Sequence, residues 1–234
     1  IRYLMRHRHT TPFEMVEFKF HCKMPIFVAR QWVRHRTANI NEYSLRYSEA
    51  RDEFYYPEPE NIQFQSSLNK QGRSGEVPPE LKQKVLDYFK ENSERSFALY
   101  QELNKAGVAR ELARSLLPVN IYTEWYWKND LHNLLHFIGL RSDSHAQYEI
   151  RVFSDAMAYY VKEKAPFAWE AYQDYVVHGM RFSKIEKGLL EKQLPERVID
   201  DIVEDIAYQL TATLHKGKPR EEADLYPLYQ KQGG

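Results

Sequence analysis

A short alternating segment near the start of the chain places the strongest constraint on the fold. In residues 15–23, after an initial Met, apolar side chains alternate with Glu, Lys and His, which is the pattern of a strand with one buried face. Residues 119–127 (VNIYTEWYW) are rich in β-branched and aromatic residues and predict a second strand. A sheet of two or three strands cannot cover its own faces, so other elements must bury them.

Helical patterns fill most of the remaining sequence. Pro25 suits the first turn of a helix that extends to the Arg-His-Arg sequence at 34–36. A long amphipathic pattern over residues 80–106 ends at Gly107, as helices commonly do. Residues 55–79 contain four prolines and two glycines and predict a long surface loop. Further helical patterns lie at 109–117, 131–140 (capped by Asn129 or Asp130), 144–164, 166–178, 183–192 and 195–214.

These elements predict a mixed α+β fold, in which many helices surround a small antiparallel-type sheet. We expect one domain over residues 1–234, with residues 167–234 as a helical C-terminal extension. A chain of this length buries roughly 70% of its unfolded surface. Ile1 opens a pattern that is already helical, so we expect that an N-terminal segment of the natural protein is missing.

Composition narrows the class of protein. No apolar run approaches the roughly 20 residues of a membrane span, so we expect a soluble protein with no membrane partner. Cys22 is the single cysteine, which excludes a disulfide framework or a thiolate metal cluster within one chain. This usage suits a reducing compartment and predicts a cytoplasmic location. We expect Cys22 itself to be a small buried apolar residue.

The charge distribution points to a local anion site. The chain has 33 Lys and Arg and 33 Asp and Glu, so its net charge does not favour a nucleic-acid partner. Residues 1–51 nevertheless contain ten basic residues and only four acidic ones. The excess gathers around Arg34, Arg36 and Arg46, whose planar guanidinium groups suit phosphate.

The geometry of this arginine cluster depends on its local structure. If the helix continued through Arg36, Arg34 and Arg36 would point about 200° apart and address two anionic groups. If residues 42–47 were extended, Glu42, Ser44 and Arg46 would share one face. The alternative interpretation is a surface salt-bridge cluster among Arg34, Arg36, Glu42 and Arg46.

A second cluster is rich in histidine and offers a rival function. His132 and His136 are four residues apart on one predicted helix, and His145 and Glu149 are four apart on the next. This spacing is compatible with a metal-dependent hydrolase. The HExxH motif is absent, however, so a polar lining for a non-metal ligand explains the same residues, and we expect no metal.

Two further arginines are candidate ligand contacts, and several common sequence motifs are absent. Arg141 precedes a predicted helix start at Ser144, and Arg114 lies in the short helix before Pro118. The glycines form no GxGxxG or phosphate-loop motif, and GxSxG is absent. A Rossmann-type dinucleotide site is therefore excluded.

The run RHRTANINEYSLRYS resembles the signature of the flavin-dependent thymidylate synthases, also called thymidylate synthase complementing proteins: Arg-His-Arg, seven residues, then Ser. HTTPFEMVEFKFHCKMPIFVARQWVRHR, ARSLLPVNIYTEWYW and LRSDSHAQYEI are also similar to that family. The resemblance extends from about Ile1 to about Pro166. Asn39 stands where the extended signature commonly has Ser.

This resemblance implies methylation of dUMP at uracil C5 to give dTMP. Methylenetetrahydrofolate would supply the carbon, and FAD reduced by NADPH would supply the hydride. It also implies a homotetramer whose active sites lie at subunit interfaces. No catalytic thiol is needed, because such enzymes activate dUMP electrostatically and use the flavin for redox and carbon handling.

The resemblance also implies roles for individual residues. Arg141 would lie at the uracil and stabilise negative charge on the ring, Ser44 would position substrate, and His9 would lie near the isoalloxazine and folate. The positions that match dUMP contacts are Gln31, Arg34, Glu42, Ser44, Arg46, Tyr47, Arg114 and Arg141. Those that match FAD contacts are Thr11, Arg34, His35, Arg36, Glu42, Asp130, His132 and His136. Two alternatives stay open: the metal-dependent hydrolase, and an oligomeric nucleotide- or RNA-binding module that uses the basic first 51 residues.

Overall fold

A computed structural model describes residues 1–67 and 72–193 of the chain. The chain divides into two compact units, residues 1–179 and 180–234. Of the second unit, the structure describes one helix, α9 (Lys184–Gln193), near the predicted 183–192. The pattern at 195–214 lies outside the described residues. No described helix is long and apolar enough to cross a membrane.

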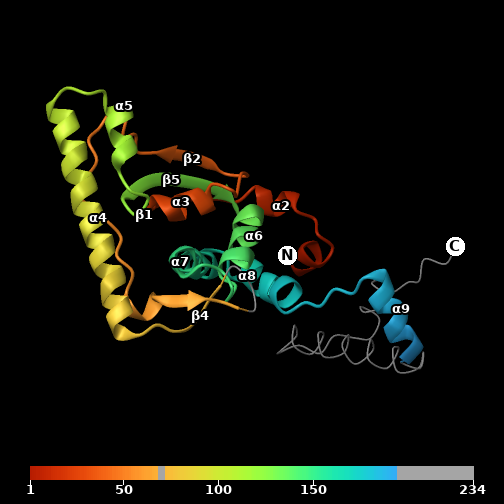
Figure 1. Ribbon diagram of the computed structural model, residues 1–234. Coiled ribbons are helices and arrows are strands. Elements are labelled where there is room, and N and C mark those ends of the chain that lie inside the picture. Colours follow the sequence, from red (N-terminus) through yellow and green to blue (C-terminus); the bar gives the residue numbers. More distant parts are fainter. Residues whose placement is uncertain (68–71, 194–234) are drawn as a thin grey trace. The chain divides into compact units, whose positions relative to one another are not determined.

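The first unit is built on a three-stranded antiparallel sheet (Figure 1). The predicted strands are β1 (Glu17–Pro25) and β5 (Tyr122–Asp130), paired from Glu17–Asp130 to Pro25–Tyr122. The third strand, β2 (Asn39–Glu42), pairs with the other edge of β5. The mixed α+β class and the small antiparallel sheet are therefore confirmed.

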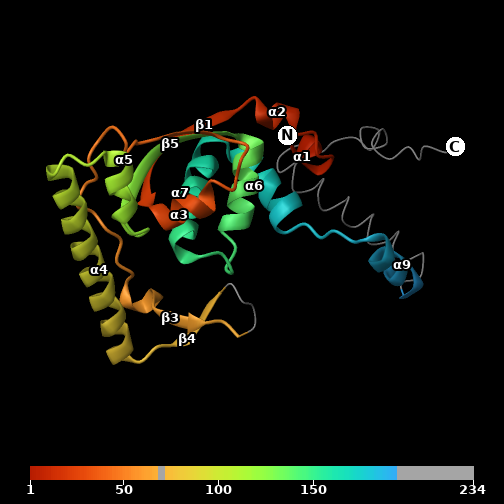
Figure 2. The ribbon, with the colours of Figure 1, turned by 45° about the horizontal axis from the view of Figure 1, so that its top comes forward.

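Helices surround this sheet and bury one of its faces (Figures 1 and 2). Buried side chains from the helices α2, α3, α6, α7 and α8 join those of β1 and β5 in one apolar cluster. The helices of the first unit are α1 (Arg2–Arg6), α2 (Thr11–Glu14), α3 (Ile26–Trp32), α4 (Pro79–Lys105), α5 (Arg110–Ala113), α6 (Leu131–Arg141), α7 (Tyr148–Lys164) and α8 (Pro166–Tyr172).

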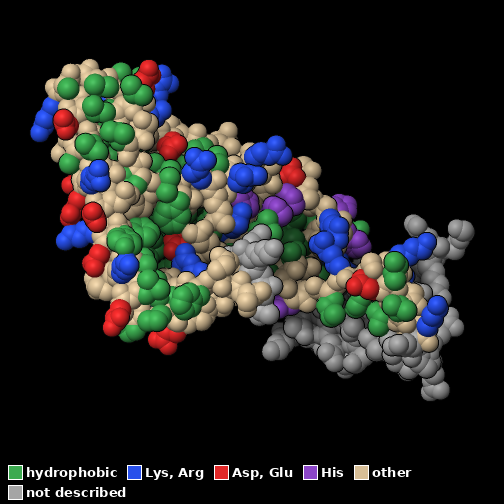
Figure 3. Space-filling model, in the orientation of Figure 1, with side chains coloured by type: hydrophobic (Ala, Val, Ile, Leu, Met, Phe, Trp, Pro, Cys, Tyr) green, Lys and Arg blue, Asp and Glu red, His purple; other side chains and the backbone are tan. Residues whose placement is uncertain are grey.

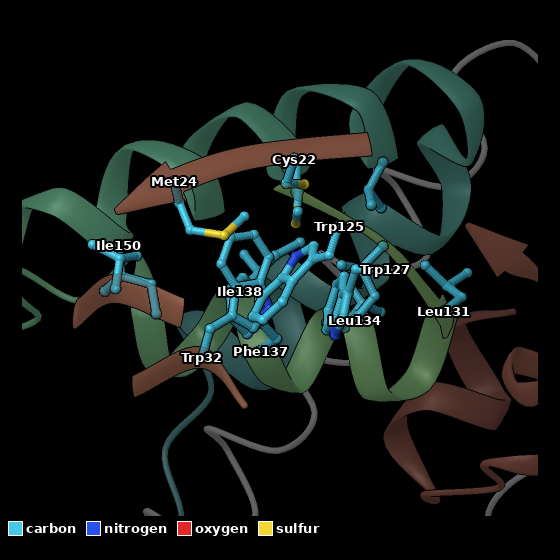
Figure 4. Packing of buried hydrophobic residues seen from close by; sticks show 14 of the residues in the cluster. Cys22, Met24, Trp32, Trp125, Trp127, Leu131, Leu134, Phe137, Ile138 and Ile150 are labelled. Atoms are coloured by element: carbon cyan, nitrogen blue, oxygen red, sulfur yellow. The ribbon is translucent and has the colours of Figure 1, made fainter. Parts of the chain in front are cut away.

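Aromatic rings form the centre of this cluster (Figure 4). Trp32 of α3 is fully buried, and its ring centroid lies 5.1 Å from that of Phe137 on α6 and 5.4 Å from those of Trp125 and Trp127 on β5. Cys22 of β1 is buried beside them, as predicted. Trp125 and Trp127 are two residues apart, so the pleat of β5 directs both toward the helices.

A second apolar cluster joins α4 to residues 45–50. Tyr100 of α4 is almost fully buried against Ala113 and Ile121, and its hydroxyl accepts a 2.9 Å hydrogen bond from the backbone N–H of Ala50. The partly buried Leu45 packs against the same cluster. The long helix therefore holds the 45–50 segment in place.

Several predicted elements differ in the structure. The helix after Pro25 ends at Trp32, so residues 34–36 are not helical. Residues 44–47 form a turn, so the extended arrangement considered for residues 42–47 does not occur. The predicted loop 55–79 contains a 3-10 turn, η1 (Pro59–Asn61), and a hairpin of β3 (Gln63–Gln65) with β4 (Arg73–Glu76), which lies beside the start of α4 in Figure 2.

Local hydrogen bonds explain two other boundaries. α7 begins at Tyr148 instead of Ser144, because the Asp143 carboxylate accepts from the backbone N–H of His145 and favours a turn there. Asp130 caps α6 by accepting from the backbone N–H of Asn133 at 2.8 Å. Two predicted helices change form along their length. The 109–117 pattern begins as α5 and continues as a 3-10 turn, η2 (Arg114–Leu116). The 166–178 pattern begins as α8 and continues as a π-helix, η3 (Gln173–Val177).

Candidate functional site

Arg141 and His35 are in direct contact, although they are far apart in the sequence. Arg141 is the last residue of α6, and His35 lies just beyond α3. The Nε–H of Arg141 donates a 2.9 Å hydrogen bond to Nε2 of His35, and both side chains are partly buried. The His35 ring also packs edge-on against Phe137 (4.9 Å between centroids), with His136 6.5 Å away. The structure thus joins three predicted site residues: His35, His136 and Arg141.

The charge states in this group follow from burial. Burial, followed by the proximity of Arg141 and His136, lowers the pKa of His35 from 6.5 to about 4. Burial also lowers the pKa of Arg141, which nonetheless stays charged near neutral pH. The pair is therefore a neutral imidazole that accepts from a guanidinium cation.

A second group of predicted residues surrounds the turn at Ser44. The Ser44 hydroxyl accepts from the backbone N–H of Arg46 at 3.3 Å. Arg46 reaches Glu111 of α5 at 3.5 Å, and Arg110 donates to the backbone carbonyl of Tyr47 at 3.3 Å. These bonds place the Ser44 turn beside α5, which leads directly into Arg114.

The other predicted arginines and Glu42 differ in whether their charged groups have partners within the protein. Arg34, Arg36 and Arg114 are exposed and have no acidic partner among the described residues. Glu42 accepts a 2.7 Å hydrogen bond from the Thr123 hydroxyl. The alternative of a salt-bridge cluster among Arg34, Arg36, Glu42 and Arg46 is wrong, because within residues 1–67 and 72–193 Arg46 pairs with Glu111 and the others form no ion pair.

Gln31 has a buried amide oxygen that has no hydrogen-bond partner among the described residues. Leaving such an acceptor unpaired is unfavourable, and a ligand N–H would satisfy it. Gln31 lies on α3 next to the fully buried Trp32, which fixes its backbone.

The predicted flavin residues of α2 and α6 lie at one end of the sheet, where Glu17 of β1 pairs with Asp130 of β5. Asp130 caps α6, and His132 and His136 follow on that helix, His132 partly buried and His136 exposed. Thr11 begins α2, and the exposed His9 precedes it, with its ring 5.9 Å from that of Tyr3. In Figure 3, Lys and Arg side chains lie next to histidines on the central part of the visible face.

The structure does not assemble the rival metal site. Glu149 accepts hydrogen bonds from Arg73 and Tyr55, while His145 bonds to Asp143 at 2.8 Å. Within the described part of the chain, no group of three His, Cys, Asp or Glu residues is arranged to hold a metal ion.

The structure also contains a polar group that the sequence did not predict as a unit. Arg73, Tyr55 and the buried Glu149 line a cavity of about 590 Å³, together with aromatic side chains such as Phe27 and Tyr88. None of the residues predicted for dUMP or FAD lines it. The sequence singled out Glu149 only for its spacing from His145 in the rival metal site, and Arg73 lies in a segment predicted to be a loop.

An arginine held at the end of a helix, a serine turn beside further arginines and an unpaired amide oxygen are groups suited to contacts with an anionic nucleotide. Residues 1–167 match the family described as thymidylate synthase complementing protein. The chain therefore belongs to this family, the flavin-dependent thymidylate synthases, which are enzymes that methylate dUMP to dTMP.

Individual relatives agree with this assignment. The flavin-dependent thymidylate synthase of Rickettsia conorii is 53% identical over 202 residues, which cover 81% of this chain and 68% of that protein. The enzyme of the same name from Dictyostelium discoideum is 52% identical over 186 residues, covering 80% of this chain and 61% of that protein. The one from Ruegeria pomeroyi is 54% identical over 187 residues, covering 78% and 62%.

Solved structures share the fold. A UMP/dUMP methylase from Streptomyces cacaoi, bound with 5-Br UMP, has a TM-score of 0.71 and 34% identity, covering 74% of this chain and 80% of that one. The same methylase bound with 5-Br dUMP has a TM-score of 0.68, with 74% and 77% covered.

Proposed function

We propose that this chain converts dUMP to dTMP with methylenetetrahydrofolate as carbon donor and with FAD reduced by NADPH as hydride carrier. The observation that carries this proposal is the contact between Arg141 and His35. It joins the Arg-His-Arg motif to the arginine expected at the uracil. The family match and the Streptomyces methylase, which was solved with brominated uridine nucleotides, support the substrate class.

The Ser44 turn is the proposed phosphate site. Ser44 offers a hydroxyl, and Arg46 and Arg114 offer guanidinium groups on neighbouring elements. Arginine binds phosphate through two parallel N–H donors, so two arginines suit the phosphate of a nucleotide. Tyr47, which is 76% exposed, would contact the nucleotide beside them.

The remaining substrate residues would recognise the nucleoside. The unpaired amide oxygen of Gln31 suits an N–H donor such as that of uracil. Arg34 is the first residue of the Arg-His-Arg sequence, and Glu42 is the last residue of β2, two positions before Ser44. Both residues stand at positions that match dUMP contacts and FAD contacts in the family.

Arg141 would activate the uracil electrostatically. A fixed cation at the ring stabilises negative charge that spreads over it, and C5 becomes more nucleophilic. Cys22 is buried in the core, and burial raises the pKa of its thiol to about 12, so it does not serve as a nucleophile. The Ser44 hydroxyl accepts from the Arg46 backbone and has no histidine partner among the described residues, which fits a positioning role.

The donor set fits a flavin dinucleotide. Arg34 and Arg36 present exposed guanidinium groups for the diphosphate, and the Thr11 hydroxyl adds a smaller donor. Asp130, His132 and His136 line the start of α6 and would contact the flavin, while His9 would lie near the isoalloxazine and folate. When bound, FAD supplies the hydride for reduction of the transferred carbon.

We further propose that the active site is completed at the subunit interfaces of a homotetramer. The two groups around Arg141 and Ser44 are joined through β2 and β5, and many of their side chains are exposed. The 590 Å³ cavity contains none of the predicted dUMP or flavin residues. Partner chains would supply the missing walls and bring His9 to a neighbouring site.

The test is dTMP formation from dUMP, methylenetetrahydrofolate and NADPH at low oxygen, with and without added FAD. We expect dTMP only when FAD is present, and Cys22→Ala should form it at the same rate per bound flavin. Mass measurement in solution should give a tetramer. A chain that binds FAD and assembles but forms no dTMP would contradict the proposal.

A further inference from the structure

His35 is held rigidly, in an orientation that fixes which of its ring nitrogens carries the proton. Its Nε2 accepts from Arg141 Nε at 2.9 Å, so in the neutral ring the proton lies on Nδ1. Its backbone N–H donates to the carbonyl of Trp32 at 2.9 Å, and its ring packs edge-on against the fully buried Phe137. A side chain held by both backbone and core can anchor the longer Arg141 side chain.

The hydrogen bond determines how Arg141 presents its charge. The guanidinium group is planar, so fixing Nε also fixes the plane in which the two terminal nitrogens lie. Neither terminal nitrogen has a protein partner in the described part of the chain. Both terminal nitrogens are therefore free to contact a ligand from the end of α6.

The surroundings of His35 keep it an acceptor. The charged or titratable groups that face it are Arg141 and His136, both from α6, and burial acts in the same direction. These effects lower its pKa to about 4, so it stays neutral at physiological pH and does not repel the guanidinium. A protonated imidazole would lose the acceptor and add a like charge.

We infer that His35 is a positioning residue that orients the Arg141 guanidinium toward the uracil of dUMP. This inference rests on the proposed function and assigns His35 a different role from that implied by the sequence resemblance, which placed it at the flavin. Because Nε2 is already bound to Arg141, only the Nδ1–H would remain for a flavin contact. His35 acts through Arg141 and does not itself touch the reacting atoms.

Two matched variants separate this role from a structural one. In His35→Gln, the amide oxygen reaches about as far as Nε2 and accepts from Arg141, whereas in the shorter His35→Asn it does not. We expect the Gln variant to bind dUMP within a few-fold of the wild type. The Asn variant should lose about tenfold to hundredfold in dUMP affinity, as expected for a lost hydrogen bond to a charged group. Flavin content per subunit should be equal in both, and exposed His178→Gln should match the wild type.

A second background tests whether His35 acts through Arg141. Arg141→Lys lacks Nε, so adding His35→Asn to it should weaken dUMP binding no further. The inference is overturned if the Asn substitution costs the same in both backgrounds, if the Gln and Asn variants are equal, or if both lose flavin in parallel. Equilibrium binding of dUMP separates the two claims: a wild type that binds dUMP but forms no dTMP contradicts the proposed function alone. A wild type that binds no dUMP contradicts both.

Discussion

Replacing Glu149 by glutamine tests what holds residues 55–79 against α7. The Glu149 side chain is 5% exposed, and both its oxygens accept from Arg73 Nη2, at 2.8 and 2.7 Å, while Oε1 also accepts from the Tyr55 hydroxyl at 2.8 Å. Removing one partner of a fully buried ion pair costs about 3–5 kcal/mol. Because the Arg73 side chain is 34% exposed and stays partly hydrated, we expect about 2–3 kcal/mol for Glu149→Gln.

Thermal unfolding at a fixed protein concentration measures this loss. For a chain of this size, 1 kcal/mol corresponds to roughly 2–4 °C, so the Tm should fall by roughly 5–10 °C. Glu94→Gln is the matched control, because Glu94 and Lys90 form an exposed pair at 3.9 Å, and its Tm should change by less than about 2 °C. If the two variants have equal Tm values, the buried pair does not hold the segment and the reasoning fails.

The same pair predicts a pH dependence. Burial alone would raise the pKa of Glu149, but the hydrogen bonds from Arg73 and Tyr55 outweigh burial and hold it below its ordinary value. Its contribution to stability is therefore present above the unfolded pKa, about 4.3, and is lost as pH falls through the lower folded value. The Tm difference between wild type and Glu149→Gln should shrink in acid; a difference that grows would contradict this sign.

Three further predictions concern single positions. Cys22 should react with a thiol reagent only after unfolding, since it is buried and its pKa is raised to about 12; stoichiometric labelling of the folded protein would show the packing is wrong. Gly107→Ala should cost about 1–2 kcal/mol in denaturant unfolding, because Gly107 has φ +79° and a Cβ there meets nothing within 4 Å, so backbone strain is the whole effect. Asp130→Ala should cost about 1 kcal/mol through loss of the α6 cap, while Asp130→Asn should retain most of the stability; equal losses would argue against capping.

Patterns in the sequence predicted those elements whose side chains alternate between core and solvent. β1 has one buried face, so its apolar residues are spaced by two, and β5 is marked by its β-branched and aromatic residues. All four residues of β2 are exposed, as are the described strands of the hairpin, so no such pattern marks them. Tertiary pairing with β5 forms β2, and local propensity does not reveal it.

Motifs predicted a set of candidate site residues but not the contacts between them. The spacing around Arg34 and Ser44 indicated an anion site, yet the helix that was expected to carry Arg34 and Arg36 ends at Trp32. The contact between His35 and Arg141 joins residues 106 apart in the sequence, and periodicity contains no information at that range. The partner of Glu149 was missed for the same reason, since Arg73 is 76 residues away.

The most direct test of the central claim is dTMP formation per bound flavin by the wild type and Arg141→Lys, measured side by side. The lysine keeps a positive charge but loses the planar group that His35 orients. The account predicts FAD-dependent dTMP from the wild type, and a variant that retains its flavin yet loses most of its turnover. Normal turnover by Arg141→Lys would contradict the role assigned to Arg141.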